Sequence, residues 1–134
     1  TGDGSFMMNP QVLIDAVEHG LHGTVVIFDN RRMAAISSLQ RAQYGQDYRT
    51  NDSVAVDYVS LAQAVTGVNA VYGGHTRSEL REALERAGRH DGLSLVHVPV
   101  YWGDDPQGHM GTYGRWNVGP WSRDVQAIYA DQTI

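Results

Sequence analysis

The chain has 134 residues, 42% hydrophobic and 19% charged, which suits one ordinary domain with a real core. Its formal net charge is −5 and its ten basic residues are scattered arginines, so the concentrated basic face that nucleic acid requires is not expected. No apolar run approaches the ~20 residues of a membrane span, and cysteine is absent. We therefore predict a cytoplasmic protein without disulfides, thiolate metal sites, nucleic-acid partners or membrane partners.

Helical and strand patterns alternate along the chain. Asn9 and Pro10 are typical of a helix start, and the apolar spacing after them predicts a helix over 9–19. Thr76 and Glu79 have the form of a capping box before an amphipathic helix that ends near 89. The other expected elements are strands at 24–28, 69–72 and 93–100 and helices at 34–42 and 57–65.

This alternation predicts an α/β fold: a single three-layer α/β/α domain over residues 1–134 with a mainly parallel sheet. From about residue 101 onward, glycine and aromatic residues predict an irregular tail. In such sheets ligands bind at the carboxyl ends of the strands. The chain begins directly on a turn, Thr1–Ser5, so we expect a fragment or one subunit of a larger whole.

That opening turn contains an Asp between two glycines, Gly2-Asp3-Gly4-Ser5. Glycines allow close approach of the backbone to an anion, and the amides at a helix start can bind phosphate. A carboxylate there would repel a bare phosphate, but it suits a divalent cation bridging carboxylate and phosphate, as Mg²⁺ does.

A second turn, Asp29-Asn30, follows the strand at 24–28. Strand-end turns of adjacent units lie close together in a parallel sheet, so Asn30 is a candidate second ligand beside Asp3. The backbone carbonyl of Arg32 is a third candidate. An all-oxygen ligand set suits Mg²⁺, Ca²⁺ or Mn²⁺ and not zinc.

Gly2-Asp3-Gly4, a spacer and Asp29-Asn30 together resemble the metal–diphosphate signature of thiamine-diphosphate enzymes. The segments 26–30, 36–40 and 56–62 resemble the acetohydroxyacid-synthase-like branch of that family. Within that branch, Phe28-Asp29-Asn30, the segment 36–40 and the segments 111–113 and 116–119 look most like the trihydroxycyclohexanedione hydrolases. One departure is Asp29, where the broad family usually has Asn.

This resemblance implies the diphosphate-binding domain of an enzyme that cleaves or joins carbon–carbon bonds of 2-keto acids or cyclic diones. The implied cofactors are thiamine diphosphate and Mg²⁺, and the implied contacts are Gly2, Asp3, Gly4, Ser5, Asn30, Arg32 and Met33, with Asp3, Asn30 and the Arg32 carbonyl on the metal. No catalytic residue is expected in this chain. The resemblance assigns the catalytic Glu to a pyrimidine-binding domain or subunit within a homo- or hetero-oligomer.

Two other readings stay open: a non-catalytic phosphate- or nucleotide-binding module, and a flavodoxin-like or receiver-type domain, against which the absence of lysine counts. His19, His22 and His75 are expected to be structural or surface residues, and His97 to be packed in a strand. His109 is a weaker candidate for substrate contact. Arg31-Arg32 is expected to be a solvated loop pair, and Leu80, Ala83, Leu84 and Ala87 a core stripe.

Overall fold

The architecture is taken from a computed structural model that describes residues 1–46, 48–49 and 54–100. The predicted tail, including His109, lies outside these residues. In chain order the elements are α1 (Asp3–Met7), α2 (Val12–Glu18), β1 (Gly23–Asp29), α3 (Ala34–Tyr44), α4 (Tyr58–Gln63), β2 (Asn69–Tyr72), α5 (Arg77–Gly88) and β3 (Leu93–Pro99).

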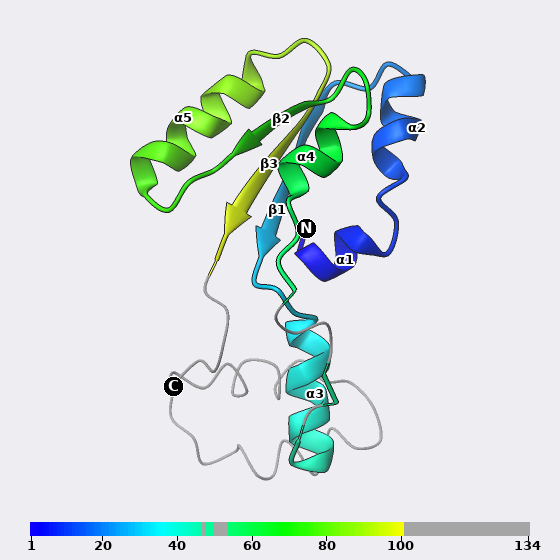
Figure 1. Cartoon of the computed structure of the whole chain (residues 1–134), viewed down its shortest axis with the longest axis vertical. Helices are drawn as coiled ribbons and strands as arrows, with labels where there is room; N and C mark the ends of the chain where they lie inside the picture. Colours follow the sequence, from blue (N-terminus) through cyan, green and yellow to red (C-terminus); the bar gives the residue numbers. More distant parts are fainter. Residues whose placement is uncertain (47, 50–53, 101–134) are drawn as a thin grey trace.

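The three strands form one parallel sheet in the order β1-β3-β2 (Figure 1). The central strand, β3, is buried along nearly its whole length because it has a neighbour on each side and helices above and below. Its residue His97 pairs in register with Ile27 of β1 and Tyr72 of β2. Side chains alternate between the two faces of a strand, so these three residues point to the same face.

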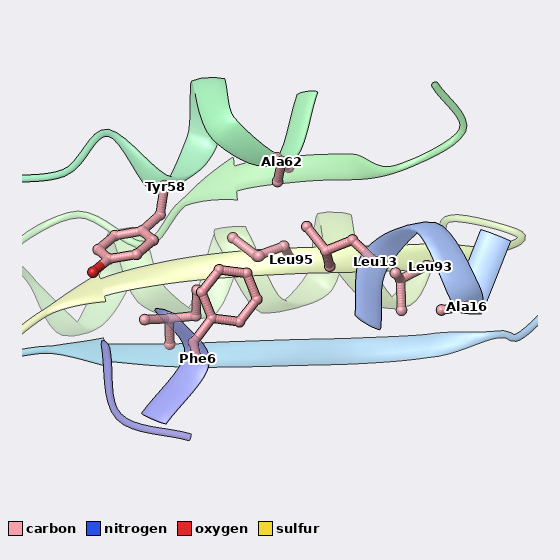
Figure 2. Close-up of a cluster of buried hydrophobic side chains, with 9 residues drawn as sticks. Phe6, Leu13, Ala16, Tyr58, Ala62, Leu93 and Leu95 are labelled. Carbon is pink, nitrogen blue, oxygen red and sulfur yellow. The ribbon is translucent and has the colours of Figure 1, made fainter. Parts of the chain in front are cut away.

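Helices cover both faces of the sheet, which confirms the predicted three-layer α/β/α fold (Figure 1). We call the side covered by α1, α2 and α4 the site face; Figure 2 shows its apolar cluster of Phe6, Leu13, Ala16, Ile27, Tyr58, Ala62, Ala70, Leu93 and Leu95. We call the opposite side the α5 face; its cluster is Val71, Ala83, Ala87, Val96 and Val98. Helix α3 extends beyond the carboxyl ends of the strands (Figure 1).

Side-chain caps fix the starts of two helices. Thr76 and Glu79 form the predicted capping box at the start of α5. Asp57 accepts a hydrogen bond from the Ser60 amide at 3.0 Å and so caps α4. Because α4 begins at the next residue, this cap also fixes the place of Tyr58 beneath the carboxyl end of the sheet.

Three local expectations need correction. The opening segment is not a plain turn, since Asp3–Met7 forms the short helix α1. The second helix starts at Val12, and Asn9 lies in the preceding turn, where its carbonyl accepts from the Val12 amide at 3.3 Å. Leu84 is 42% exposed and is not part of the core stripe, because α5 presents Ala83 and Ala87 to the sheet.

None of the helices in the described part of the chain has the length and apolar composition needed to cross a bilayer.

Candidate functional site

The start of the chain runs alongside β1 as an extension of the sheet. The Thr1 amino group donates to the Val26 carbonyl at 2.8 Å, and the Phe28 amide donates to the Thr1 carbonyl at 2.9 Å. Gly2 and Phe28 form a parallel β-bridge. This pairing brings Asp3, the next residue, to the carboxyl end of β1, as the adjacency of strand-end turns predicts.

A tight loop follows β1 and reaches the Asp3 carboxylate. The backbone amide of Asn30 donates to Asp3 Oδ1 at 3.4 Å, and the two residues are 27 positions apart in sequence. Within the loop the Arg31 amide donates to Asp29 Oδ1 at 3.0 Å, and the Arg32 amide donates to Asn30 Oδ1 at 3.2 Å. Arg31 adopts φ +57°, in the left-handed region that side chains other than glycine seldom occupy. The loop therefore folds back on itself beside Asp3.

A pocket of about 500 Å³ opens at this junction, and we call it the site pocket. All seven residues that the sequence singled out line it: Gly2, Asp3, Gly4, Ser5, Asn30, Arg32 and Met33. The rest of its lining is Met8, Phe28, Ala34, Ala35, Ile36 and Val100. The first residues of α3 are among these, so the amide end of that helix borders the pocket.

The site pocket contains one buried carboxylate, Asp3, and one basic side chain, Arg32. The Asp3 side chain is buried, and burial raises the pKa of its carboxyl, with the nearby Asp29 charge acting in the same direction. Hydrogen bonds from the Asn30 and Gly4 amides act against that increase. Burial and the charges of Asp3 and Asp29 also raise the pKa of Tyr58 to about 12. The negative charges of both carboxylates therefore act on the Tyr58 hydroxyl.

A buried contact between His97 and Asp29 lies beside the site pocket, and the sequence does not predict it. His97 Nε2 lies 2.9 Å from Asp29 Oδ2, with side-chain exposures of 11% and 8%. His97 is packed in β3 as expected, and Asp29 forms this contact from the Asp29-Asn30 turn at the end of β1. The available signal was positional: both residues lie near the carboxyl ends of neighbouring buried strands.

The other polar residues are arranged as follows. His19, His22 and His75 are exposed; His22 pairs with Asp91 at 3.0 Å, and His75 Nε2 lies 2.9 Å from the Tyr72 hydroxyl. Arg31 and Arg32 are half-buried, which corrects the expectation of a solvated pair. Arg31 lines a second cavity of about 640 Å³ on the Tyr72 and His97 side of the loop.

Within the described residues, no three or more His, Cys, Asp or Glu side chains gather into a metal-binding group. The oxygen atoms near the site pocket include the Asp3 carboxylate and the side-chain oxygen of Asn30. Such a partial set is what Mg²⁺ uses when a phosphate ligand supplies the rest.

Taken together, the parallel sheet and the glycine-rich pocket at the strand ends define an α/β domain that binds a cofactor or phosphate compound. Residues 1–98 match the family of thiamine pyrophosphate enzymes, C-terminal TPP binding domain, and the chain belongs to that family. Thiamine diphosphate, the same compound as thiamine pyrophosphate, is the cofactor of this family.

Individual relatives agree with this membership. The chain is 31% identical, over 97% of its length, to a 3D-(3,5/4)-trihydroxycyclohexane-1,2-dione hydrolase of Lacticaseibacillus casei, and it covers 21% of that protein. It is 35% identical, over 74% of its length, to the hydrolase of the same name from Bacillus subtilis, and covers 16% of it. These matches confirm the predicted resemblance to trihydroxycyclohexanedione hydrolases.

A solved structure supports the fold. The thiamine diphosphate-dependent 4-hydroxybenzoylformate decarboxylase of Rhodococcus jostii RHA1 matches 78% of the chain with a TM-score of 0.69 and 21% identity. The chain spans about a fifth of the length of that enzyme and of the Lacticaseibacillus casei relative.

Proposed function

We propose that the site pocket binds the diphosphate of thiamine diphosphate through Mg²⁺, in an enzyme that cleaves or joins carbon–carbon bonds. The observation that carries this proposal is the contact between the Asn30 amide and Asp3 Oδ1, at 3.4 Å. It joins two strand-end turns that are far apart in sequence, and all seven candidate residues border the same pocket.

The oxygen donors of this pocket fit Mg²⁺. Asp3 offers a carboxylate, Asn30 a side-chain amide oxygen and Arg32 a backbone carbonyl, a hard-ligand set suited to this ion. Asn30 Oδ1 already accepts from the Arg32 amide, but an amide oxygen has a second lone pair for a metal. Two neighbouring buried carboxylates, Asp3 and Asp29, repel each other, and a dication would offset that cost.

The shape of the pocket fits a diphosphate. A Cβ atom on Gly4 would overlap the sulfur of Met33, so a larger residue here would have to displace the Met33 side chain that lines the pocket. The pocket is also bordered by Ala34 and Ala35, the first residues of the eleven-residue helix α3. The first amides of a helix lack intrahelical partners and attract anionic oxygens.

Thiamine diphosphate supplies the carbanion chemistry when it is bound. The residues of this chain hold its charged end and set its orientation, while Gly4 and Met33 shape the wall of the pocket. Among the residues that the structure describes, no glutamate lines the site pocket. We propose that a pyrimidine-binding domain or subunit provides the catalytic Glu, and that the complete enzyme is an oligomer acting in the cytoplasm.

We propose a cyclic dione as the substrate class, because the relatives are named as hydrolases of trihydroxycyclohexane-1,2-dione. A 2-keto acid is the second choice, supported by the resemblance of the 26–30 segment to acetohydroxyacid synthases. The structural neighbour, named as a decarboxylase of 4-hydroxybenzoylformate, acts on a compound of that second kind.

The test is Mn²⁺ broadening of amide signals in the 134-residue chain, with Mn²⁺ standing in for Mg²⁺. We expect the signals of Gly4, Asn30 and Arg32 to broaden only when thiamine diphosphate is present. Asp3→Ala and Asn30→Ala should each raise the Mn²⁺ concentration needed for this broadening by at least about 100-fold. Even residues that only support metal ligands contribute about 10–100-fold to metal affinity.

Asp15→Ala is the matched control, because Asp15 is an exposed carboxylate on α2 outside the site pocket. Its broadening should equal that of the unaltered chain. Equal broadening in Asp3→Ala would disprove the metal assignment. Binding of thiamine diphosphate without any metal requirement would instead favour the non-catalytic phosphate-binding module.

A further inference from the structure

The Asp29–His97 pair joins the loop after β1 to the central strand. The two residues are 68 positions apart, and their contact, at 2.9 Å, is buried. Burying two ionisable side chains is costly, and an apolar pair of similar size is often equally or more stable. Fold stability is therefore a weak explanation for a polar pair at this place, next to the site pocket.

The His97 ring is held in one orientation by aromatic neighbours. The Tyr58 ring lies edge-on at 5.1 Å between centroids, and the Tyr72 ring at 5.5 Å. Tyr58 itself is fully packed at the carboxyl end of the site-face cluster, next to Phe6 (Figure 2). Because its ring cannot turn freely between these two tyrosines, His97 fixes the place of the atom that it bonds, Asp29 Oδ2.

Asp29 passes this constraint to the loop. Its other carboxylate oxygen, Oδ1, accepts the Arg31 amide at 3.0 Å, and its carbonyl accepts the Val100 amide at 2.9 Å. Arg31 has φ +57°, an unfavourable conformation for an arginine that needs such a tie to persist. With Arg31 held there, the amide of Asn30 is directed toward Asp3 and the amide of Arg32 toward Asn30 Oδ1.

We propose that His97 is a positioning residue for the diphosphate and metal site: through Asp29 it holds the 30–32 loop in the conformation that binds the cofactor. This inference rests on the function proposed above. Without His97, Asp29 Oδ2 loses its buried partner and the carboxylate remains close to Asp3. The Asp29 side chain then turns toward solvent, and the Arg31 backbone leaves its left-handed conformation. As a result, Asn30 Oδ1 and the Arg32 carbonyl oxygen no longer lie beside the Asp3 carboxylate.

Two substitutions separate the hydrogen bond from the packing. His97→Phe keeps an aromatic ring between Tyr58 and Tyr72 and removes the bond to Asp29. His97→Gln places an N–H donor near the position of Nε2 and should restore the bond. Tyr72→Phe is the matched control, because it keeps the ring beside His97 and removes only the hydroxyl that bonds His75.

The first readout is the Mn²⁺ concentration that broadens the amide signals of Asn30 and Arg32 in the presence of thiamine diphosphate. We expect His97→Phe to raise this concentration about 10–100-fold, as for other residues that support metal ligands. His97→Gln should recover most of the loss, and Tyr72→Phe should match the unaltered chain. The second readout needs no cofactor: hydrogen exchange of the Arg31 amide should become faster in His97→Phe alone.

Val96→Ala, on the α5 face of the same strand, controls for a general loss of stability. It should lower the unfolding temperature without changing Arg31 exchange or the Mn²⁺ response. If His97→Phe broadens like the unaltered chain, the positioning role is wrong while the proposed function stands. If the unaltered chain shows no broadening with thiamine diphosphate, the proposed function fails and the positioning role fails with it.

Discussion

The two faces of the sheet are built from the same three strands but differ in kind. The α5 face buries apolar side chains and one uncharged polar residue, Ser94, whose hydroxyl donates to the Ala87 carbonyl at 3.0 Å. Its helix starts with a complete capping box. The site face also has a large apolar cluster, yet toward the carboxyl ends it buries Asp3, Asp29 and His97. Apolar packing contributes stability wherever it occurs, whereas buried carboxylates reduce it unless a partner compensates. The comparison indicates that the α5 face stabilises a sheet whose other face accommodates a destabilising site.

Substitution of a core residue on the α5 face should have the largest effect on stability. Val96 is completely buried in β3 and packs beneath α5. Val96→Ala should lower the free energy of unfolding by about 1.5–3 kcal/mol, the usual contribution of a buried side chain of this size. Urea unfolding followed by circular dichroism measures the change. The Mn²⁺ response of the folded protein should not change, and a large loss of that response would show that the two faces are not separable.

Removal of the helix cap on the same face should have a smaller effect. Thr76 accepts the Glu79 amide at 3.3 Å and lies within hydrogen-bond distance of Glu79 Oε2, at 2.8 Å. Thr76→Ala should cost about 1 kcal/mol of stability, and Thr76→Ser should cost much less because a hydroxyl remains. Thermal unfolding of both variants provides the measurement. Equal losses in the Ala and Ser variants would mean that the cap is not what stabilises α5.

The capping box of α5 and most of the site pocket could be predicted from the sequence because their signals are local or follow a general rule. The capping box is four consecutive residues, and Asp3 and Asn30 follow from the closeness of strand ends in a parallel sheet. The sequence does not predict helix α1, because the glycines at positions 2 and 4 suggest a turn. The residue before the helix, Gly2, pairs with Phe28 of β1.

The sequence alone predicts neither the Asp29–His97 contact nor which side of helix α5 packs against the sheet. The contact between Asp29 and His97 depends on the register of β1 against β3, which no local pattern specifies. Leu84 has helical spacing with Leu80, but only Leu80 of the two packs against the α5-face cluster, beside Ala83 and Ala87. Sequence periodicity gives the existence of an apolar stripe and not its rotation about the helix axis.

The smallest predicted change in stability is also the one that tests the site face directly, since it should be a gain. Burial raises the pKa of Asp3 above its ordinary value of 3.8, so the folded protein resists ionising a group that the unfolded chain ionises readily. At neutral pH this ionised carboxylate therefore destabilises the cofactor-free protein. Asp3→Asn keeps an oxygen that can accept from the Asn30 amide but carries no charge. It should stabilise the cofactor-free chain at pH 7 by about 0.5 kcal/mol, the low end for single stabilising substitutions, while abolishing the Mn²⁺ response.

The pH dependence gives this gain a distinctive sign. As the pH falls through the raised pKa of folded Asp3 and then below 3.8, the native carboxyl becomes neutral and the advantage of Asp3→Asn should disappear. Hydrogen bonds from Ser60 and Thr76 lower the pKa values of Asp57 and Glu79, so these two carboxylates also lose their contribution to stability in acid. Because the unaltered chain and the Asn variant both contain them, this loss cancels when the two stabilities are compared. Thermal unfolding of the two proteins from pH 7 to pH 3 measures the difference directly. An Asn variant that is less stable than the unaltered chain at pH 7 would mean that Asp3 is a structural residue, and the contrast between the two faces would be lost.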